Sequence, residues 1–185
     1  FLPFDESIPR SNPHRYYASR EWELAYVETN QLIRAINQHL AQALEKRGYG
    51  CVVLPPTHNF DEEKLISDWS HKHVAYIAGL GSFGLHHMLI TEEGSSGRLG
   101  SLITEVPIEP TPRGAAEGCL YNHDKSCLVC VKRCPSGALT ENGFDPDRGY
   151  ALLLENAERN KDLGLADACG KCIRNSSAFA VSRCP

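Results

Sequence analysis

Residues Cys119 to Pro135 read Cys-Leu-Tyr-Asn-His-Asp-Lys-Ser-Cys-Leu-Val-Cys-Val-Lys-Arg-Cys-Pro. A second group of cysteines follows in the stretches Cys169–Cys172 and Cys184–Pro185. Of the eight cysteines in the chain, only Cys51 lies outside these stretches. Thiols concentrated in this way predict that the C-terminal part of the chain folds around a metal or a metal cluster.

The spacing of these cysteines indicates an iron–sulfur cluster. The bacterial ferredoxin run is C-x2-C-x2-C-x3-C-P, and its last cysteine serves the second cluster of a pair. Cys127, Cys130, Cys134 and Pro135 match the end of that run, and Cys119 would be its first cysteine, set back by a longer loop. Proline removes a backbone donor and ends the turn. The ending recurs at the C-terminus, which strengthens the prediction.

Three other interpretations of the cysteines compete with the iron–sulfur cluster. Disulfides are disfavoured, because a chain of 185 residues can bury a core without covalent staples. Zinc remains open, since two C-x2-C pairs suit a tetrahedral site, although it leaves Cys134 and Cys184 without a role. A free buried thiol, which behaves as a small apolar group, fits Cys51 best.

Composition indicates a globular protein of ordinary polarity. Hydrophobic residues make up 42% of the chain and charged residues 23%, and the formal net charge is −4. There is no polybasic footprint for nucleic acid, and no apolar run approaches the length of a membrane span. Thiols kept reduced for a metal predict a cytoplasmic protein. The chain begins with Phe1 and no methionine, so we expect an N-terminal portion to be missing.

The first half of the chain predicts an irregular arm over residues 1–18, followed by a long helix. Ser19 is the expected N-cap, and helical spacing of apolar residues continues to about Gly48. An apolar run from Cys51 to Leu54 predicts a buried strand. Residues 57–70 are expected to form a loop entering a helix, which continues over 71–78.

The glycine-rich stretch Gly79–Gly84 reads G-x-G-x-x-G. A dinucleotide-binding fingerprint needs a strand before this motif and a helix after it. Here a helix is expected before it and a strand over 85–91 after it, so a Rossmann site is disfavoured. A second strand over 99–107 is expected to pair with 85–91 as a hairpin. Residues 107–118 form the expected boundary, and 149–163 the helical insert of the cysteine part.

Several motifs together resemble those of the epoxyqueuosine reductases, and more loosely those of the catalytic subunits of reductive dehalogenases. The resemblance covers roughly residues 14–185, and its motifs occur in the same order. They are the stretches Ala78–Gly84, Met88–Thr91, Gly100–Ile108, Glu117–Cys119 and Cys127–Leu139.

The resemblance implies an α/β (α+β) chain in two parts. Residues 1–113 would form a core like the nitroreductase and flavin-reductase fold, and residues 114–185 a ferredoxin-like module with 4Fe–4S clusters. In that family the clusters pass electrons to a cobalamin. The implied function is therefore that of an oxidoreductase delivering electrons to a corrinoid or a flavin.

The resemblance also implies roles for individual residues. Gly79, Gly81 and Gly84 would belong to the loop that faces the corrinoid. One cluster would be held by Cys119, Cys127, Cys130 and Cys184, and the other by Cys134, Cys169 and Cys172. The basic side chains of Lys125, Lys132 and Arg133 would offset the charge of the thiolates.

Three departures from the family pattern bear on these roles. The fourth cysteine of the second cluster falls on Gly149, so either Cys51, His123 or a nearby aspartate replaces it or only one cluster forms. The spacings before Cys127 and after Cys172 are longer than in the family. The catalytic aspartate falls in Val52–Pro55, with Asp61 and Asp68 only loosely nearby, so the catalytic residue stays unassigned.

Two alternatives from other classes remain open. One is a non-catalytic module shaped by zinc or a single cluster, and the other is a simple ferredoxin-like electron carrier. A redox partner protein is expected, while a small-molecule and a tRNA substrate both remain open.

Overall fold

The computed structural model describes residues 1–56, 60–112 and 117–173, so Cys184 and Pro185 lie outside the described residues. It combines helices with short antiparallel strands, which confirms the α+β class. The helices are α1 (Ser7–Ser11), α2 (Arg20–Glu45), α3 (His71–Ile77), α4 (Leu120–Asp124), α5 (Val129–Arg133), α6 (Pro146–Arg159), η1 (Lys161–Leu163) and η2 (Lys171–Ile173).

The strands are β1 (Leu2–Pro3), β2 (Cys51–Val53), β3 (Phe60–Asp61), β4 (Ile66–Ser67), β5 (Gly81–Phe83), β6 (Leu89–Thr91), β7 (Gly97–Arg98), β8 (Leu102–Thr104), β9 (Leu139–Thr140) and β10 (Gly143–Phe144). Within the described ranges they form five two-stranded antiparallel sheets, which pair β1 with β7, β2 with β8, β3 with β4, β5 with β6, and β9 with β10.

The long helix α2 forms as its sequence predicts. The Ser19 side chain accepts a hydrogen bond from the backbone N–H of Trp22, and Glu21 and Glu23 lie in the first turn. The Ser19 side chain pairs one of the free N–H groups at the start of the helix. The two glutamates are stabilised by the positive end of the helix dipole. After the last turn the chain reverses at Gly48, whose φ of 89° favours glycine.

The strand pairing differs from the expected hairpin of residues 85–91 with 99–107. Strand β8 instead pairs with β2, with Val52 opposite Ile103, and β6 pairs with β5. The hairpin was the pairing between neighbours in the sequence, whereas the observed pair joins strands about 50 residues apart. The expected strand at 85–91 also begins only at Leu89.

Two further expectations for the first half are wrong. Residues 60–67 form the short hairpin β3–β4 rather than the start of a helix. Strand β2 is not buried, because Val52 is 55% exposed. The N-terminal arm is also partly ordered into β1 and α1.

In the second half, the helical insert begins a little earlier than predicted, because Asp145 caps α6 through the N–H of Arg148.

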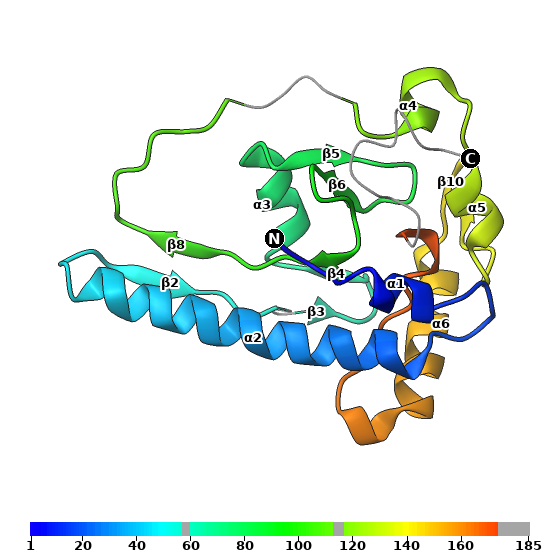
Figure 1. Cartoon of the computed structure of the whole chain (residues 1–185), viewed down its shortest axis with the longest axis horizontal. Helices are drawn as coiled ribbons and strands as arrows, with labels where there is room; N and C mark the ends of the chain where they lie inside the picture. The colour runs from blue at the N-terminus through cyan, green and yellow to red at the C-terminus, as the bar shows by residue number, and fades with distance from the viewer. Residues whose placement is uncertain (57–59, 113–116, 174–185) are drawn as a thin grey trace.

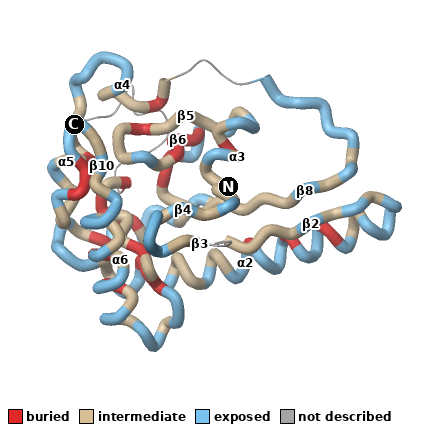
Figure 2. The backbone as a smooth tube through the Cα atoms, turned by 180° about the vertical axis from the view of Figure 1, so that it is seen from behind, coloured by how far each residue is buried: buried red, intermediate tan, exposed pale blue. Residues whose placement is uncertain are grey.

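The main apolar cluster joins the two ends of the chain. Trp22 of α2 packs with Ala168 and Ile173, and Phe4 and Ile8 lie against it. Buried residues gather where α6 and the start of α2 meet (Figure 2). The segment from Ala168 to Ile173 is therefore anchored on the N-terminal end of α2.

The cysteine-bearing helices and the β2–β8 sheet lie at opposite ends of α2. Helices α5 and α6 lie at the end of the molecule where α2 begins, and β2 and β8 run along the C-terminal end of α2 (Figure 1). Among the described residues, no helix combines the length and apolar character needed to cross a membrane.

Candidate metal centre

Six thiols from three separate segments are electrostatic neighbours. The thiol of Cys130 interacts with those of Cys119 and Cys127, which we call, with Cys130, the first thiol group. The thiol of Cys172 interacts with those of Cys169 and Cys134, which form with it the second thiol group. Cys172 also interacts with Cys130, so the two groups adjoin one another.

Burial perturbs the thiols unequally. It raises the pKa of Cys130 to about 11, and the neighbouring thiols of Cys119 and Cys127 add to that effect. It raises the pKa of Cys172 to about 12, again with help from adjacent thiols. Burial also raises the pKa of Cys169, against the lowering effect of Lys171. These surroundings favour the neutral thiols, so a metal bound here would have to displace their protons.

Short helices place the cysteines. Cys130 lies on α5, whose first turn is closed by the N–H of Lys132 donating to the carbonyl of Leu128 at 3.0 Å. Helix α5 packs against η2, which carries Cys172. The C-x2-C turn and the ferredoxin-like run therefore face each other, although they are well separated in the sequence.

Backbone N–H groups point at two of the sulfurs. The N–H of Leu85 donates to Sγ of Cys119 at 3.4 Å, and that of Leu139 donates to Sγ of Cys134 at 3.4 Å. Hydrogen bonds of this kind stabilise thiolate charge and tune the potential of iron–sulfur clusters.

The thiols lie near one another, but they are not arranged as the ligands of a metal ion are. Across the three described ranges, no group of three or more His, Cys, Asp or Glu side chains is placed as metal ligands are. All seven cysteines in these ranges are free thiols. The donor set itself is soft and sulfur-rich, which suits an iron–sulfur cluster or zinc.

The glycine-rich stretch has local structural reasons for its glycines. Gly79 follows α3 with a φ of 81°, as a helix-ending glycine does. A Cβ on Gly81 would lie 2.0 Å from the backbone oxygen of Ile90 across the β5–β6 pair. A Cβ on Gly84 would lie 2.8 Å from the ring of His86. A cofactor is not needed to explain these positions.

The same stretch docks on the start of the cysteine run. The N–H of Gly118 donates to Oγ of Ser82 at 2.9 Å, and the amide of Asn122 donates to the carbonyl of Phe83 at 2.9 Å. Together with the bond from Leu85 to Cys119, these contacts hold β5 against the first thiol group.

The residues that could replace the missing fourth cysteine are scattered. Gly149 lies in α6, and a Cβ there would be 2.8 Å from the ring of Phe144, so this ring occupies the space beside it. Cys51 lies in β2, at the end of α2 remote from α5 (Figure 1). His123 is exposed on α4, and Asp145 is engaged in capping α6.

Asp61 is poorly suited to donate a proton. Its carboxylate accepts hydrogen bonds from the backbone N–H groups of Glu63 and Lys64 and pairs with the Lys64 ammonium at 3.1 Å. These bonds, with Lys64 the main source, lower its pKa. Asp61 therefore stabilises the β3–β4 turn as an ionised group.

Lys171 and His86 had no role in the sequence prediction. Lys171 is 1% exposed and lies between Cys169 and Cys172. His86 accepts a hydrogen bond from the N–H of Met88, and burial lowers its pKa to about 4, so it is neutral. The position of Lys171 between the two cysteines of a C-x2-C pair could have drawn attention to it in the sequence. No feature of the sequence singled out His86.

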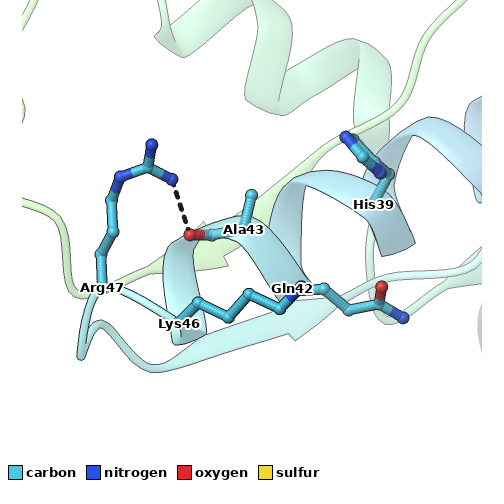
Figure 3. A pocket seen from close by; sticks show the side chains of 5 residues that line it. All are labelled: His39, Gln42, Ala43, Lys46 and Arg47. Carbon is cyan, nitrogen blue, oxygen red and sulfur yellow. Dashed lines mark hydrogen bonds between the residues drawn. The ribbon is translucent and has the colours of Figure 1, made fainter.

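The surface hollows do not coincide with the thiols. One is lined by His39, Gln42, Ala43, Lys46 and Arg47 at the end of α2, where Arg47 donates to the carbonyl of Ala43 at 2.8 Å (Figure 3). It is an open depression formed by the last turns of the helix and the residues after it, and it holds no cysteine.

Comparison with known proteins finds similar proteins that are all named epoxyqueuosine reductase. The epoxyqueuosine reductase of Listeria monocytogenes is 46% identical over 72 residues, which are 38% of this chain and 17% of that protein. That of Escherichia coli is 31% identical over 124 residues, 64% of this chain and 30% of the relative. That of Aliivibrio fischeri is 30% identical over 132 residues, 69% of this chain and 30% of the relative.

The chain thus spans less than one third of the length of these relatives. No protein-family profile matches it, and no solved structure matches it either. The matches confirm the resemblance that the motifs carry: the chain is a divergent relative of the epoxyqueuosine reductases.

Proposed function

We propose that the chain is a 4Fe–4S protein of the oxidoreductase class, which passes electrons to a corrinoid or a flavin. The names of its relatives support the oxidoreductase class. The single observation that carries the cluster proposal is the adjacency of six thiols drawn from three segments of the chain. Structural residues alone would have no need to gather so many thiols.

The first cluster would be held by Cys119, Cys127 and Cys130, with Cys184 as the fourth ligand. The second would be held by Cys134, Cys169 and Cys172, and its fourth ligand is open. A cluster supplies one-electron transfer when it is bound. The chain's own residues would orient the thiolates and donate N–H bonds to the sulfurs of Cys119 and Cys134.

The proposed acceptor site is the face of the glycine-rich stretch, with Gly79, Gly81 and Gly84. Its support is the hydrogen bond from Leu85 to Cys119, which places this stretch directly beside a proposed cluster ligand. Electrons leaving the first thiol group would then have a short path to a cofactor at this face. The division into a core over 1–113 and a module over 114–185 belongs to the same proposal.

Zinc in a structural role and a simple electron carrier are the competing functions. Zinc would leave no acid-labile sulfide and no visible absorption, and its binding would contribute folding free energy without redox change. A simple carrier would bind clusters but neither a corrinoid nor a flavin. A redox partner and a cytoplasmic location follow from the proposal and are part of it.

The test is anaerobic purification and reconstitution, followed by analysis of iron, sulfide and zinc and by a visible spectrum. About eight iron atoms per chain are expected for two clusters and about four for one. Zinc without sulfide would contradict the proposal. Titration of the loaded protein with cobalamin and with flavin then separates a reductase from a simple carrier.

A further inference from the structure

We propose that a hollow between the N-terminal arm and the end of α6 binds a free ribonucleotide, with its base on Tyr16, its phosphate at Arg15 and Arg159, and its ribose hydroxyls at Glu21. The hollow measures about 420 Å³, and these four side chains are among those that line it. This volume lies in the range of small-molecule sites. The inference goes beyond the proposed function, because it needs neither a cluster nor a corrinoid or flavin.

The loop between α1 and α2, which forms one wall of the hollow, is fixed against α6 (Figure 1). The N–H of Ala18 donates to Oδ1 of Asn156 at 3.2 Å, and Asn156 is fully buried. Arg20 donates to Oδ1 of Asn160 at 3.2 Å and pairs with Asp162. The walls are therefore held together before a ligand arrives, so little ordering is needed on binding.

Two tyrosines give the hollow an exposed aromatic surface. Tyr16 is 45% exposed and Tyr17 is 37% exposed. Their rings meet edge to face, with centroids 4.8 Å apart, and the guanidinium of Arg159 lies 4.1 Å from the centroid of the Tyr17 ring. These contacts fix Tyr17 and leave much of Tyr16 accessible. Exposed aromatic rings of this kind stack on the bases of nucleotides, whatever the base.

Two arginines at the hollow have no carboxylate partner. Across the three described ranges, neither Arg15 nor Arg159 forms an ion pair, whereas Arg20 in the same wall is paired with Asp162. A guanidinium binds phosphate through two parallel hydrogen bonds. Arg15 and Arg159 therefore supply the positive charge that the phosphate of a nucleotide needs.

Two carboxylates at the same place argue against a bare anion as the ligand. Glu21 lines the hollow, and Glu155 of α6 is an electrostatic neighbour of Tyr16. Both would repel inorganic phosphate or sulfate. A carboxylate accepts hydrogen bonds from ribose hydroxyls, as it does in dinucleotide sites. A ribonucleotide alone carries the ring, the anion and the hydroxyls that this mixture of side chains matches.

The experiment is isothermal titration calorimetry of the whole chain with adenosine monophosphate (AMP), adenosine, ribose 5-phosphate and 2′-deoxyadenosine monophosphate. We expect AMP to bind about tenfold more tightly than adenosine, which lacks the phosphate, or ribose 5-phosphate, which lacks the base. Absence of saturable binding at about 1 mM AMP overturns the inference. Equal affinity for AMP and ribose 5-phosphate also overturns it, because the aromatic surface would then play no part.

Substitutions assign the parts of the ligand to residues. Tyr16→Leu should weaken AMP binding about tenfold, and Tyr16→Phe should keep it, because phenylalanine stacks equally well. Arg15→Gln should weaken the binding of AMP and leave that of adenosine unchanged. Glu21→Gln should reduce the preference for AMP over its 2′-deoxy form.

Arg10→Gln is the matched control for charge. Arg10 lies on α1, pairs with Glu6 and does not line the hollow, so its loss should not change the affinity for AMP. Equal weakening in Arg10→Gln and Arg15→Gln overturns the inference, since AMP would then respond only to net charge. Wild-type affinity in Tyr16→Leu overturns it as well. Urea unfolding shows first that each variant is folded; if Tyr16→Leu is not, Arg15→Gln decides, because its side chain is exposed.

Discussion

The two thiol groups are built in different ways. The first is assembled from a local run of sequence around α4 and α5 and is held from outside by the β5 strand, through Asn122 and Leu85. The second depends on α2 and the N-terminal arm, which reach it through Trp22 and Asn12. The thiols of the first group are therefore brought together mainly by their spacing in the sequence. Those of the second group are brought together by contacts between distant parts of the chain.

The largest effect is expected where the two groups meet. Cys130 is buried and interacts with thiols of both groups, so Cys130→Ser should remove most of the bound iron rather than one ligand's share. Cys51→Ser is the control, because Cys51 lies in β2 and its thiol bonds to Thr104 of the paired strand β8 and to the carbonyl of Tyr49. Iron and sulfide analysis after anaerobic reconstitution measures both variants.

If Cys51→Ser lost iron as well, Cys51 would be a ligand and its assignment to the β2–β8 sheet would not explain it. Retention of full iron by Cys130→Ser would show that the two groups do not share this residue.

The second group should be sensitive to a single added methyl. Gly170 has a φ of 66°, and a Cβ there would lie 1.9 Å from the ring of Trp22. Strain and overpacking together should lower the free energy of unfolding of Gly170→Ala by about 3 kcal/mol. Iron bound through the second group should be lost, and iron bound through the first kept.

Gly48→Ala separates the effect of backbone strain from the effect of steric overlap with a neighbouring side chain. Gly48 also has a positive φ, of 89°, but nothing lies within 4 Å of an added Cβ. It should cost about 1 kcal/mol and leave the iron content unchanged. Equal losses in the two variants, measured by urea unfolding, would argue that Trp22 yields to the added methyl.

Substitution of Asn12 and of Asn122 compares how strongly each thiol group is anchored to the rest of the protein. Asn12 is fully buried and binds both Lys171 and the Cys169 carbonyl, so Asn12→Ala should cost about 2 kcal/mol and expose a buried charge. Asn122 is exposed and makes its bond to Phe83 in contact with water, so Asn122→Ala should cost about 0.5 kcal/mol. Urea unfolding of both variants gives the two costs, and a larger cost for Asn122 would reverse the comparison.

What the sequence predicted follows the same division. Helix α2 depends on neighbours a few residues away, such as the Ser19 cap, and was predicted correctly. The pairing of β2 with β8 joins Cys51 to Thr104, and propensity carries no information about a partner that distant. The burial of Lys171 depends on Asn12, 159 residues away in the chain.

A pH dependence of stability is expected from Glu23, whose charge acts on Cys169 of the second thiol group. Burial raises the pKa of Glu23 from 4.5 to about 7, although the bond from Asn160 and the charges of Arg159, Arg20 and Lys171 act against it. The folded protein therefore binds this proton more tightly than the unfolded chain does. The free energy of unfolding should fall as the pH rises from about 4.5 to about 7, and should level off above that.

Glu23→Gln isolates this contribution, because glutamine keeps the shape of the side chain and cannot ionise. The difference between the urea unfolding midpoints of wild type and variant should change between pH 5 and pH 7, in favour of the variant at the higher pH. Every other titrating group is present in both proteins and cancels in the difference. Parallel profiles would mean that the Glu23 carboxylate is as stable in the fold as in water, and the second thiol group would then be less isolated from solvent than its buried asparagine and lysine indicate.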